Sequence, residues 1–201
     1  LKTVGKVAKK KTGTRVRFWA DFQIFPSDEG FTWETLLARA RQTAFLVPGL
    51  TINCFDERGE EVVHESFRFD GGVVDFVDWL SNDGAVTDTW HIQGEGTFTE
   101  TVQALDPESG HLRAVETERI CEVDCALRWG IGYDAQLESF VNIIATPKGG
   151  THVAGFEQAV LKVLRSQVDK NARKLKVGAK DGRPEKDDVL AGMTAVVTVR
   201  F

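Results

Sequence analysis

The 201-residue sequence is poor in several residue types, with three cysteines, one methionine, one tyrosine and five prolines. The cysteines are Cys54, Cys121 and Cys125; they are too few for a disulfide framework and odd in number, which suits a reducing compartment. Cys121 and Cys125 stand four residues apart in a strand-like stretch, so both point to one face. No nearby Cys/His pair could complete a zinc site, so we interpret them as buried thiols and predict no metal.

Long apolar runs are also missing. No stretch approaches the ~20 apolar residues of a membrane-spanning helix. The basic start Lys9-Lys10-Lys11 does not lead into the apolar core of a signal peptide. These absences predict a cytoplasmic protein with no membrane partner. The formal net charge of −5 argues against a surface that grips nucleic acid everywhere, although it leaves room for a local basic face.

The common motifs of nucleotide binding and nucleophilic catalysis are absent as well. There is no G-x-x-x-x-G-K-[ST] phosphate loop and no G-x-G-x-x-G motif. None of the serines lies in a nucleophile-elbow sequence, and the four histidines are scattered. His152 stands near an expected helix start, where a packed or hydrogen-bonded role is favoured over that of a catalytic base. We therefore predict no catalytic residue.

What the sequence does contain centres on Gly149-Gly150-Thr151-His152 and the segment that follows. Thr151 is a candidate N-cap, because its hydroxyl can accept a free N–H of a first helical turn. Apolar residues then recur every three or four positions, which predicts an amphipathic helix that buries this stripe against a sheet. The stripe consists of Phe156, Ala159, Val160, Val163, Leu164 and Val168. The flanking segments 140–145 and 194–201 are rich in β-branched residues and are expected to be strands.

The first part of the chain predicts a strand, a helix and a hairpin. Residues 15–19 alternate in the manner of a half-buried strand. A helix is expected to begin after the N-cap Thr32, to bury a stripe that includes Leu36 and Phe45, and to end at Pro48-Gly49. Residues 50–56 and 62–69 are then expected to pair as two strands of a hairpin.

The second part of the chain predicts a mostly antiparallel sheet. Residues 73–80 have the pattern of a short amphipathic helix, and the polar stretch 93–118 predicts a hairpin extension. Residues 120–129 alternate, with every odd position apolar, and residues 136–145 are expected to return antiparallel to them. The chain is therefore predicted to be an α+β protein with a boundary near Asp70-Gly71-Gly72.

A basic run lies in and just after the expected long helix. Its members are Lys162, Arg165, Lys170, Arg173 and Lys174. The first three fall off the apolar stripe, so they are expected to point outward or sideways. Such a run can be a solvated helix face that compensates the helix C-terminus, or a surface for weak contact with phosphates. From the residues alone both interpretations stay open.

Five ordered stretches carry a family resemblance. They are residues 13–19, 39–50, 69–77, 139–156 and 187–197. In this order they resemble the B subunit of bacterial type IIA DNA topoisomerases, that is, gyrase B and its topoisomerase IV counterpart ParE, over essentially the whole chain. The sequence Phe45-Leu46-Val47-Pro48-Gly49-Leu50 and the long insertion from Thr97 to Thr117 look more like an actinobacterial ParE-like subunit than a gyrase B.

The resemblance implies an architecture. Residues 1–70 would be the C-terminal part of a GHKL ATPase domain, an α/β sandwich, starting at the end of its ATP lid. Residues 71–201 would be a transducer domain, with a fold like that of ribosomal protein S5 domain 2. The family's catalytic Glu, its Mg-binding Asn and its adenine motif would lie before Leu1, and its Gln-Thr-Lys loop after Phe201. The chain would then be a fragment that hydrolyses no ATP alone.

The resemblance also implies cofactors, partners and site residues. The intact subunit would be a DNA topoisomerase that uses ATP and Mg²⁺ and closes as a dimer with a second B subunit. It would work with the topoisomerase A subunit on double-stranded DNA. Thr14 would help to hold the adenine end of the nucleotide, and Val16 would line the same pocket. The five basic residues of the run would face the cavity that holds the transported duplex.

Two other functions fit parts of the sequence. A stand-alone nucleic-acid-binding module could use an S5-like sheet and the basic helix, but the net charge of −5 disfavours it. A mismatch-repair or chaperone type of GHKL ATPase could carry a similar second domain. The Gly71-Gly72 and Gly149-Gly150-Thr151-His152 stretches speak against that alternative.

Overall fold

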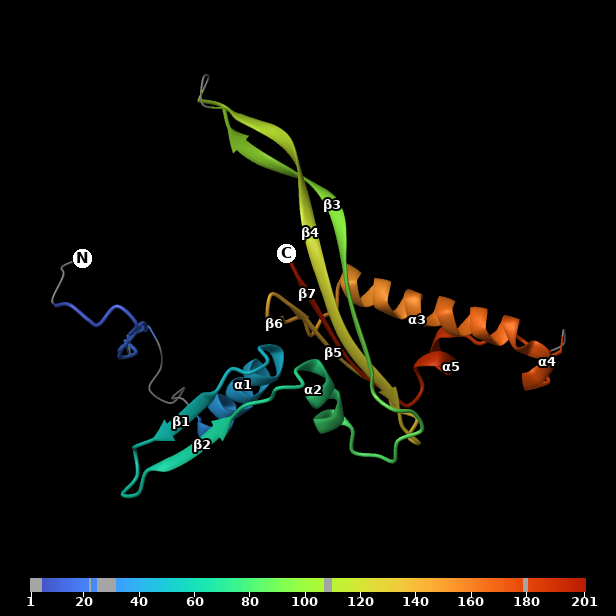
Figure 1. Cartoon of the computed structure of the whole chain (residues 1–201), viewed down its shortest axis with the longest axis horizontal. Helices are drawn as coiled ribbons and strands as arrows, with labels where there is room; N and C mark the ends of the chain where they lie inside the picture. The colour runs from blue at the N-terminus through green and yellow to red at the C-terminus, as the bar shows by residue number, and fades with distance from the viewer. Residues whose placement is uncertain (1–4, 22, 25–31, 107–109, 179–180) are drawn as a thin grey trace.

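The computed structural model describes residues 5–21, 23–24, 32–106, 110–178 and 181–201, which form two units (Figure 1). The N-terminal unit consists of α1 (Trp33–Leu46), β1 (Ile52–Asp56) and β2 (Val63–Phe67). The C-terminal unit consists of α2 (Val73–Leu80), β3 (Trp90–Leu105), β4 (Leu112–Trp129), β5 (Gln136–Val141), β6 (Ile144–Ala145), α3 (Thr151–Lys170), α4 (Ala172–Leu175), α5 (Lys186–Leu190) and β7 (Met193–Arg200). The predicted α+β class is confirmed.

Helix α1 begins where the sequence predicts. The Thr32 hydroxyl oxygen accepts the backbone N–H of Thr35 at 3.4 Å, which satisfies one free donor of the first turn. The helix ends before Pro48, and Gly49 then adopts a φ of 80°, which glycine tolerates without strain. The buried side chains of α1 are Ala40, Ala44, Phe45 and Leu46. Leu36, which was expected in the buried stripe, is instead 42% exposed.

Strands β1 and β2 pair antiparallel from Ile52↔Phe67 to Asp56↔Val63, so the predicted hairpin is confirmed. The turn between them is held by Arg58, whose backbone N–H and guanidinium donate to the Asp56 carboxylate at 3.1 and 2.8 Å. These hydrogen bonds, the side-chain one first, lower the pKa of Asp56 to about 2.

An aromatic stack joins the two units. The Phe45 ring lies between Phe69 and Phe76, at centroid distances of 3.6 and 4.7 Å. Phe76 in turn lies 6.0 Å from Phe140 in the large sheet. Phe45 is 1% exposed and belongs to the same core cluster as Val77 and Phe140. The core is therefore continuous across the predicted boundary near Asp70, and the division into two domains stays a prediction.

The large sheet has the strand order β3-β4-β7-β5-β6. The prediction that residues 136–145 return antiparallel to 120–129 is confirmed in direction, because β7 pairs antiparallel with β4 and parallel with β5. Strands β4 and β5 do not pair with each other, since β7 lies between them. Seven of the eight β7 residues are buried, so the most apolar strand takes the place that is covered on both faces. The segment is also interrupted at Asn142 and Ile143, where positive φ angles of 47° and 65° turn the chain back as β6.

The predicted strand at residues 15–19 is wrong. The segment is irregular, and Val16, Phe18 and Trp19 are 79%, 65% and 77% exposed. Its alternation could supply one apolar face, but a strand also needs a neighbour for its backbone N–H and C=O groups. No strand within the described ranges pairs with it.

Strands β3 and β4 form a long hairpin, which confirms the predicted extension. They pair without interruption from Trp90↔Leu127 to Leu105↔Leu112. Strand β7 covers β4 only from Glu122 to Trp129. Residues 97–105 and 112–120, hereafter the arm, therefore stand out from the sheet as two strands (Figure 1). Residues 107–109, between the two strands, lie outside the described ranges.

Helix α3 departs from the prediction in two ways. Its N-cap is Gly150 and not Thr151, and no side-chain hydrogen bond caps it. The turn comes one residue early, because Gly149 adopts a φ of 71° and Gly150 is extended, so that Thr151 is already helical. The apolar stripe is also not fully covered: no α3 residue is buried, and Val163 is 57% exposed. The helix overhangs the sheet and ends beside α4 (Figure 1).

Candidate nucleic-acid interface

The start of α3 is fixed to the sheet by a chain of hydroxyl and imidazole groups. Ser139 Oγ and Thr146 Oγ1 are hydrogen-bonded at 2.7 Å, and Thr146 Oγ1 is hydrogen-bonded to His152 Nε2 at 3.1 Å. Ser139 is buried on β5. His152 thus has the hydrogen-bonded role that the sequence favours. Phe156 and Val160, one and two turns further along, pack against Leu127 and Met193 of the sheet.

Beyond that contact the inner side of α3 faces the sheet across an apolar groove of about 1010 Å³. The groove is lined by the helix stripe and by odd-numbered β4 residues, including Cys121 and Cys125. These cysteines face the same way, as the alternation predicts. Burial raises the pKa of the Cys125 thiol to about 11, with a smaller contribution from the Asp124 carboxylate. The Cys125 thiol donates to the backbone carbonyl of Ile92 at 3.6 Å.

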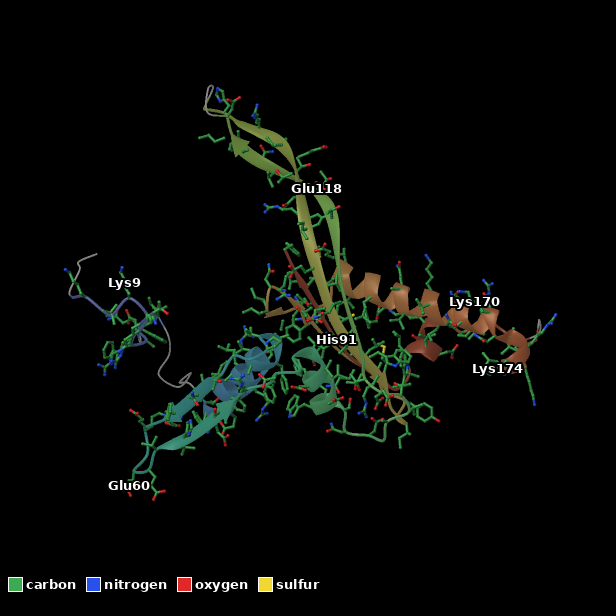
Figure 2. The ribbon with its side chains drawn as sticks, viewed as in Figure 1. Lys9, Glu60, His91, Glu118, Lys170 and Lys174 are labelled. Carbon is green, nitrogen blue, oxygen red and sulfur yellow. The ribbon has the colours of Figure 1, made fainter. Side chains whose placement is uncertain are left out.

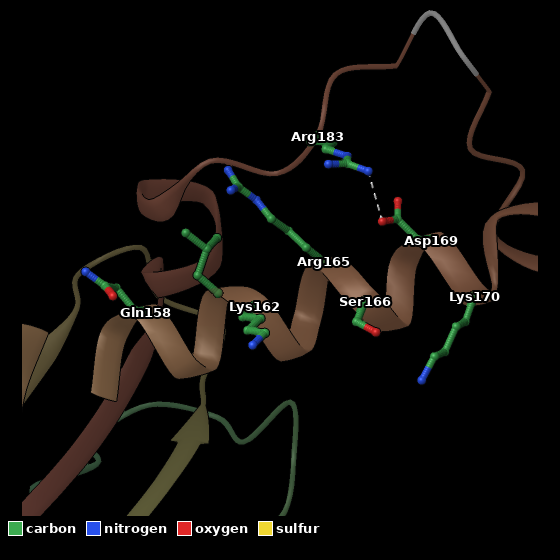
Figure 3. A pocket seen from close by; sticks show the side chains of 8 residues that line it. Gln158, Lys162, Arg165, Ser166, Asp169, Lys170 and Arg183 are labelled. Atoms are coloured by element: carbon green, nitrogen blue, oxygen red, sulfur yellow. Dashed lines mark hydrogen bonds and ion pairs between the residues drawn. The ribbon is translucent and has the colours of Figure 1, made fainter. Parts of the chain in front are cut away.

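The outer side of α3 faces residues 181–185 across a second hollow of about 530 Å³ (Figure 3). Polar side chains dominate its lining: Gln158, Lys162, Arg165, Ser166, Asp169, Lys170 and Arg183. Figure 3 shows that Arg165 reaches from the helix toward this loop and that Arg183 reaches from the loop toward Asp169. Lys162 and Lys170 point away from the loop on the other side of the helix. The predicted basic run is therefore not one continuous face.

Arg165 has a structural partner. Its Nε donates to the backbone carbonyl of Pro184 at 2.8 Å, and the side chain is half-buried. Next to it, Arg183 Nη2 lies 3.2 Å from the Asp169 carboxylate. These two interactions tie the loop to α3. Arg165 is thus better suited to hold the loop in place than to offer a free charge to a ligand.

The other four members of the run are exposed: Lys162, Lys170, Arg173 and Lys174. None of them forms an ion pair with another residue that the structure describes. We refer to these four residues as the basic face. It extends over the second half of α3 and the short helix α4 (Figure 2). Because α3 rises about 1.5 Å per residue, the four charges spread over about 18 Å.

This geometry allows both interpretations of the basic run. Cations in the last helical turn are stabilised by the negative end of the helix dipole, which accounts for Lys170. Lys162 lies two turns earlier and gains little from the dipole. Exposed, unpaired lysines and arginines are also the groups that make weak, salt-dependent contacts with phosphates. The arrangement can therefore contact a polyanion, with Lys162 and Lys170 at the border of the hollow beside residues 181–185.

The two residues predicted to be near a nucleotide lie elsewhere. Thr14 and Val16 are exposed in the irregular segment, and neither lines the groove beneath α3 or the hollow beside residues 181–185. The structure does not bring them near the basic face. In the same ranges no three His, Cys, Asp or Glu side chains gather as metal ligands would. No helix in the described part of the chain is long and apolar enough to cross a membrane.

One structurally prominent residue has no counterpart among the sequence predictions. Arg41 on α1 places its guanidinium over the rings of Phe67 and Trp79, at 5.1 and 5.3 Å from their centroids. It thereby bridges the N-terminal unit and α2 beside the aromatic stack. No local pattern could have indicated it, because the two rings come from segments 26 and 38 residues further along the chain.

Comparison with known proteins places these features in a family. The family model for DNA gyrase B matches residues 72–201. The gyrase B protein of Streptomyces coelicolor is 35% identical over 211 aligned residues, covering 96% of this chain and 28% of the relative. The gyrase B protein of Campylobacter jejuni is 37% identical, covering 98% and 22%. The corresponding DNA topoisomerase 4 protein of Enterococcus faecalis is 34% identical, covering 100% and 25%.

A solved structure of the same family also matches this chain. The 43K ATPase domain of Thermus thermophilus gyrase B, determined in complex with an aminocoumarin, matches with a TM-score of 0.62 and 26% identity. The match covers 90% of this chain and 42% of that one. The chain spans about a quarter of the length of the curated relatives it matches. Because these relatives include both gyrase and topoisomerase 4 proteins, the likeness to a ParE-like subunit stays a prediction.

Proposed function

This chain belongs to the DNA gyrase B family, and from that premise we propose that it relays the nucleotide state of a type IIA topoisomerase B subunit to the DNA. The single observation that carries the proposal is the aromatic stack Phe69–Phe45–Phe76–Phe140. Through these rings a displacement of the N-terminal unit is passed to the large sheet, and with it to α3. Close-packed interiors transmit such displacements because they deform little.

Within this proposal, residues 1–70 are the C-terminal part of a GHKL ATPase domain and residues 71–201 are the transducer. The start of the family match at residue 72 supports this division. A separate small core in the N-terminal unit supports it too; its buried members are Ala40, Ala44, Cys54 and Phe67. The two units would then be joined through the aromatic stack and not merely by a linker.

The intact subunit would act in the cytoplasm as an ATP-dependent DNA topoisomerase. ATP with Mg²⁺ would favour the closed dimer of two B subunits, because nucleotide contacts made only in that state shift the population toward it. The topoisomerase A subunit would open the double-stranded DNA that the other duplex crosses. The sequence contains no G-x-x-x-x-G-K-[ST] phosphate loop and, by the resemblance, no catalytic Glu, so we expect no ATP hydrolysis from the 201-residue chain alone. Turnover by this chain in a coupled assay would contradict the assignment.

Thr14 and Val16 would border the nucleotide site of the intact subunit. In that subunit, Thr14→Val should weaken nucleotide binding, because the hydroxyl that reaches the adenine end, partly through water, is lost while the shape is kept. Calorimetry of the intact subunit with a non-hydrolysable ATP analogue measures this loss. Thr14→Ser, which keeps the hydroxyl, is the control. Equal affinities of the valine variant and the wild type would show that the Thr14 hydroxyl does not contribute to nucleotide binding.

The basic face would meet the transported duplex. Lys162→Gln, Lys170→Gln and Lys174→Gln together should lower strand passage and DNA-stimulated ATP hydrolysis in the intact enzyme. They should also reduce the salt dependence of DNA binding, by about one unit of slope for each lost phosphate contact. The corresponding triple Lys→Arg variant keeps the charge and should behave like the wild type. Unchanged activity and an unchanged salt slope in the glutamine variant would show that the basic face is a solvated surface that does not contact DNA.

A further inference from the structure

The arm is the part of the large sheet in which, among the described strands, only β3 and β4 pair; Phe98 at its base also packs edge-to-face on Phe201, with ring centroids 5.9 Å apart. Beyond the Glu122↔Arg200 pair, β4 has no neighbour other than β3 in the described ranges. In Figure 1 the arm rises away from α1, α2 and α3. Two-stranded hairpins are marginally stable in water unless a third strand or a packed surface covers them. A surface that covers the arm would therefore stabilise it.

The charge of the arm region indicates the charge of a surface that could cover it. Between Glu95 and Glu122 the sequence has seven acidic and two basic residues, a formal charge of −5 that equals the net charge of the whole chain. Some of these acids are neutralised: Glu100 pairs with Arg119 at 3.2 Å. Others are not, so a surface that covers the arm must supply positive charge.

Three exposed carboxylates lie together on one side of the arm and its base. They are Glu95, Glu116 and Glu118, and none forms an ion pair with a described residue. The register pairs Glu95 with Glu122, Thr101 with Glu116 and Thr99 with Glu118. Cross-strand partners share a face, and so do residues two apart on one strand, so all three carboxylates point the same way. We refer to these three residues as the acidic arm face.

The chain carries a matching positive surface, the basic face on α3 and α4. The two surfaces lie on elements that diverge: Glu118 is on the arm, whereas Lys170 and Lys174 are at the far end of the long helix (Figure 2). The two charged surfaces have similar lengths. The acidic arm face extends from Glu116 to the Glu95↔Glu122 pair, a rise of about 20 Å along β4. The basic face extends over about 18 Å.

We propose that, when no DNA occupies the basic face, the acidic arm face of one copy docks on the basic face of a second copy. In a symmetric pair each copy offers both surfaces, so two such contacts close the dimer. A strip about 20 Å long and 10 Å wide buries about 200 Å² on each side, or about 400 Å² per copy for two contacts. That area is typical of a weak, transient interface. The contact is mainly electrostatic, so it weakens as salt rises.

A charge swap in the 201-residue chain tests this. Glu116→Lys/Glu118→Lys makes both surfaces positive, and Lys170→Glu/Lys174→Glu makes both negative. Sedimentation velocity at low salt should show self-association of the wild type and at least tenfold weaker self-association of either double variant. A mixture of the two double variants should associate again, and so should the chain that carries all four changes. High salt should abolish every one of these associations.

The controls separate charge complementarity from other causes. Glu60→Lys/Glu61→Lys changes the charge of the distant β1–β2 turn and should leave the association unchanged. Circular dichroism shows whether each variant keeps its fold. The proposal is overturned if the wild type does not associate at low salt. It is equally overturned if the swaps have no effect, or if the mixture of folded variants does not associate. The assay contains neither ATP nor DNA, so its outcome is independent of the relay function proposed above.

Discussion

Replacing Phe45 with alanine should destabilise both units of the chain together. Phe45 is 1% exposed and stacks between Phe69 and Phe76, at 3.6 and 4.7 Å. It comes from the N-terminal unit, but it belongs to the core of the large sheet. The loss of this ring removes packing from the two sides of the predicted boundary at once.

The expected cost is large. Truncating a buried phenylalanine costs about 3–5 kcal/mol, because the transfer free energy is lost and a cavity remains. Stacked aromatic pairs contribute about 0.5–1.5 kcal/mol beyond the buried area, so the upper half of that range applies. A domain of this size has a total stability of about 5–15 kcal/mol. Phe45→Ala should therefore bring the chain close to its unfolding threshold.

Urea unfolding measures the loss of stability, and hydrogen exchange shows which elements are destabilised. The free energy of unfolding should fall by about 4 kcal/mol, and exchange should accelerate in α1 and in β7 together. Leu36→Ala on the same helix is the control; that side chain is 42% exposed and should cost under about 1 kcal/mol. A loss below about 1 kcal/mol for Phe45→Ala, or faster exchange confined to α1, would refute the continuous core.

Three further predictions concern single residues. Ile143→Gly should stabilise the chain by about 1 kcal/mol in thermal unfolding, because a β-branched residue is strained at its φ of 65°; a lower stability would show that the Ile143 side chain contributes more than its strain costs. Cys125, with its pKa raised to about 11, should react with iodoacetamide at pH 8 far more slowly in the folded chain than in urea, as mass spectrometry can follow, and equal rates would contradict its burial. The pKa of Asp56 is lowered from 3.8 to about 2, so its carboxylate stabilises the fold fully above about pH 4 and loses that contribution as the pH falls through 2. Asp56→Asn should remove this part of the acid sensitivity in unfolding measured against pH. An unchanged dependence of stability on pH would contradict the prediction.

The sequence predicted the elements whose signals are local. The N-cap at Thr32, the β1–β2 hairpin and the short helix α2 all follow from turn chemistry or from helical spacing within one segment. The long β3–β4 hairpin is of the same kind. In each case the pattern and the element occupy the same short stretch of chain, so no distant partner is needed to interpret them.

The errors concern partners that are distant in the sequence. The sequence could not show that β7 is the neighbour of β5, because β7 lies more than 50 residues later and takes the central place in the sheet. The exposure of residues 15–19 depends on whether a neighbouring strand is there to pair with them. For the same reason the basic run was found as a set, but the hydrogen bond from Arg165 to the Pro184 carbonyl became evident only in three dimensions.

The most direct test of the proposed relay is ATP-dependent strand passage by an intact B subunit that carries this sequence, reconstituted with a topoisomerase A subunit. The account predicts that catenated DNA circles separate only when ATP and Mg²⁺ are present. It also predicts that Phe45→Leu, which keeps an apolar side chain but removes the ring stack, lowers strand passage more than ATP hydrolysis without DNA. Equal losses of strand passage and of hydrolysis, or strand passage that does not require ATP, would contradict the relay.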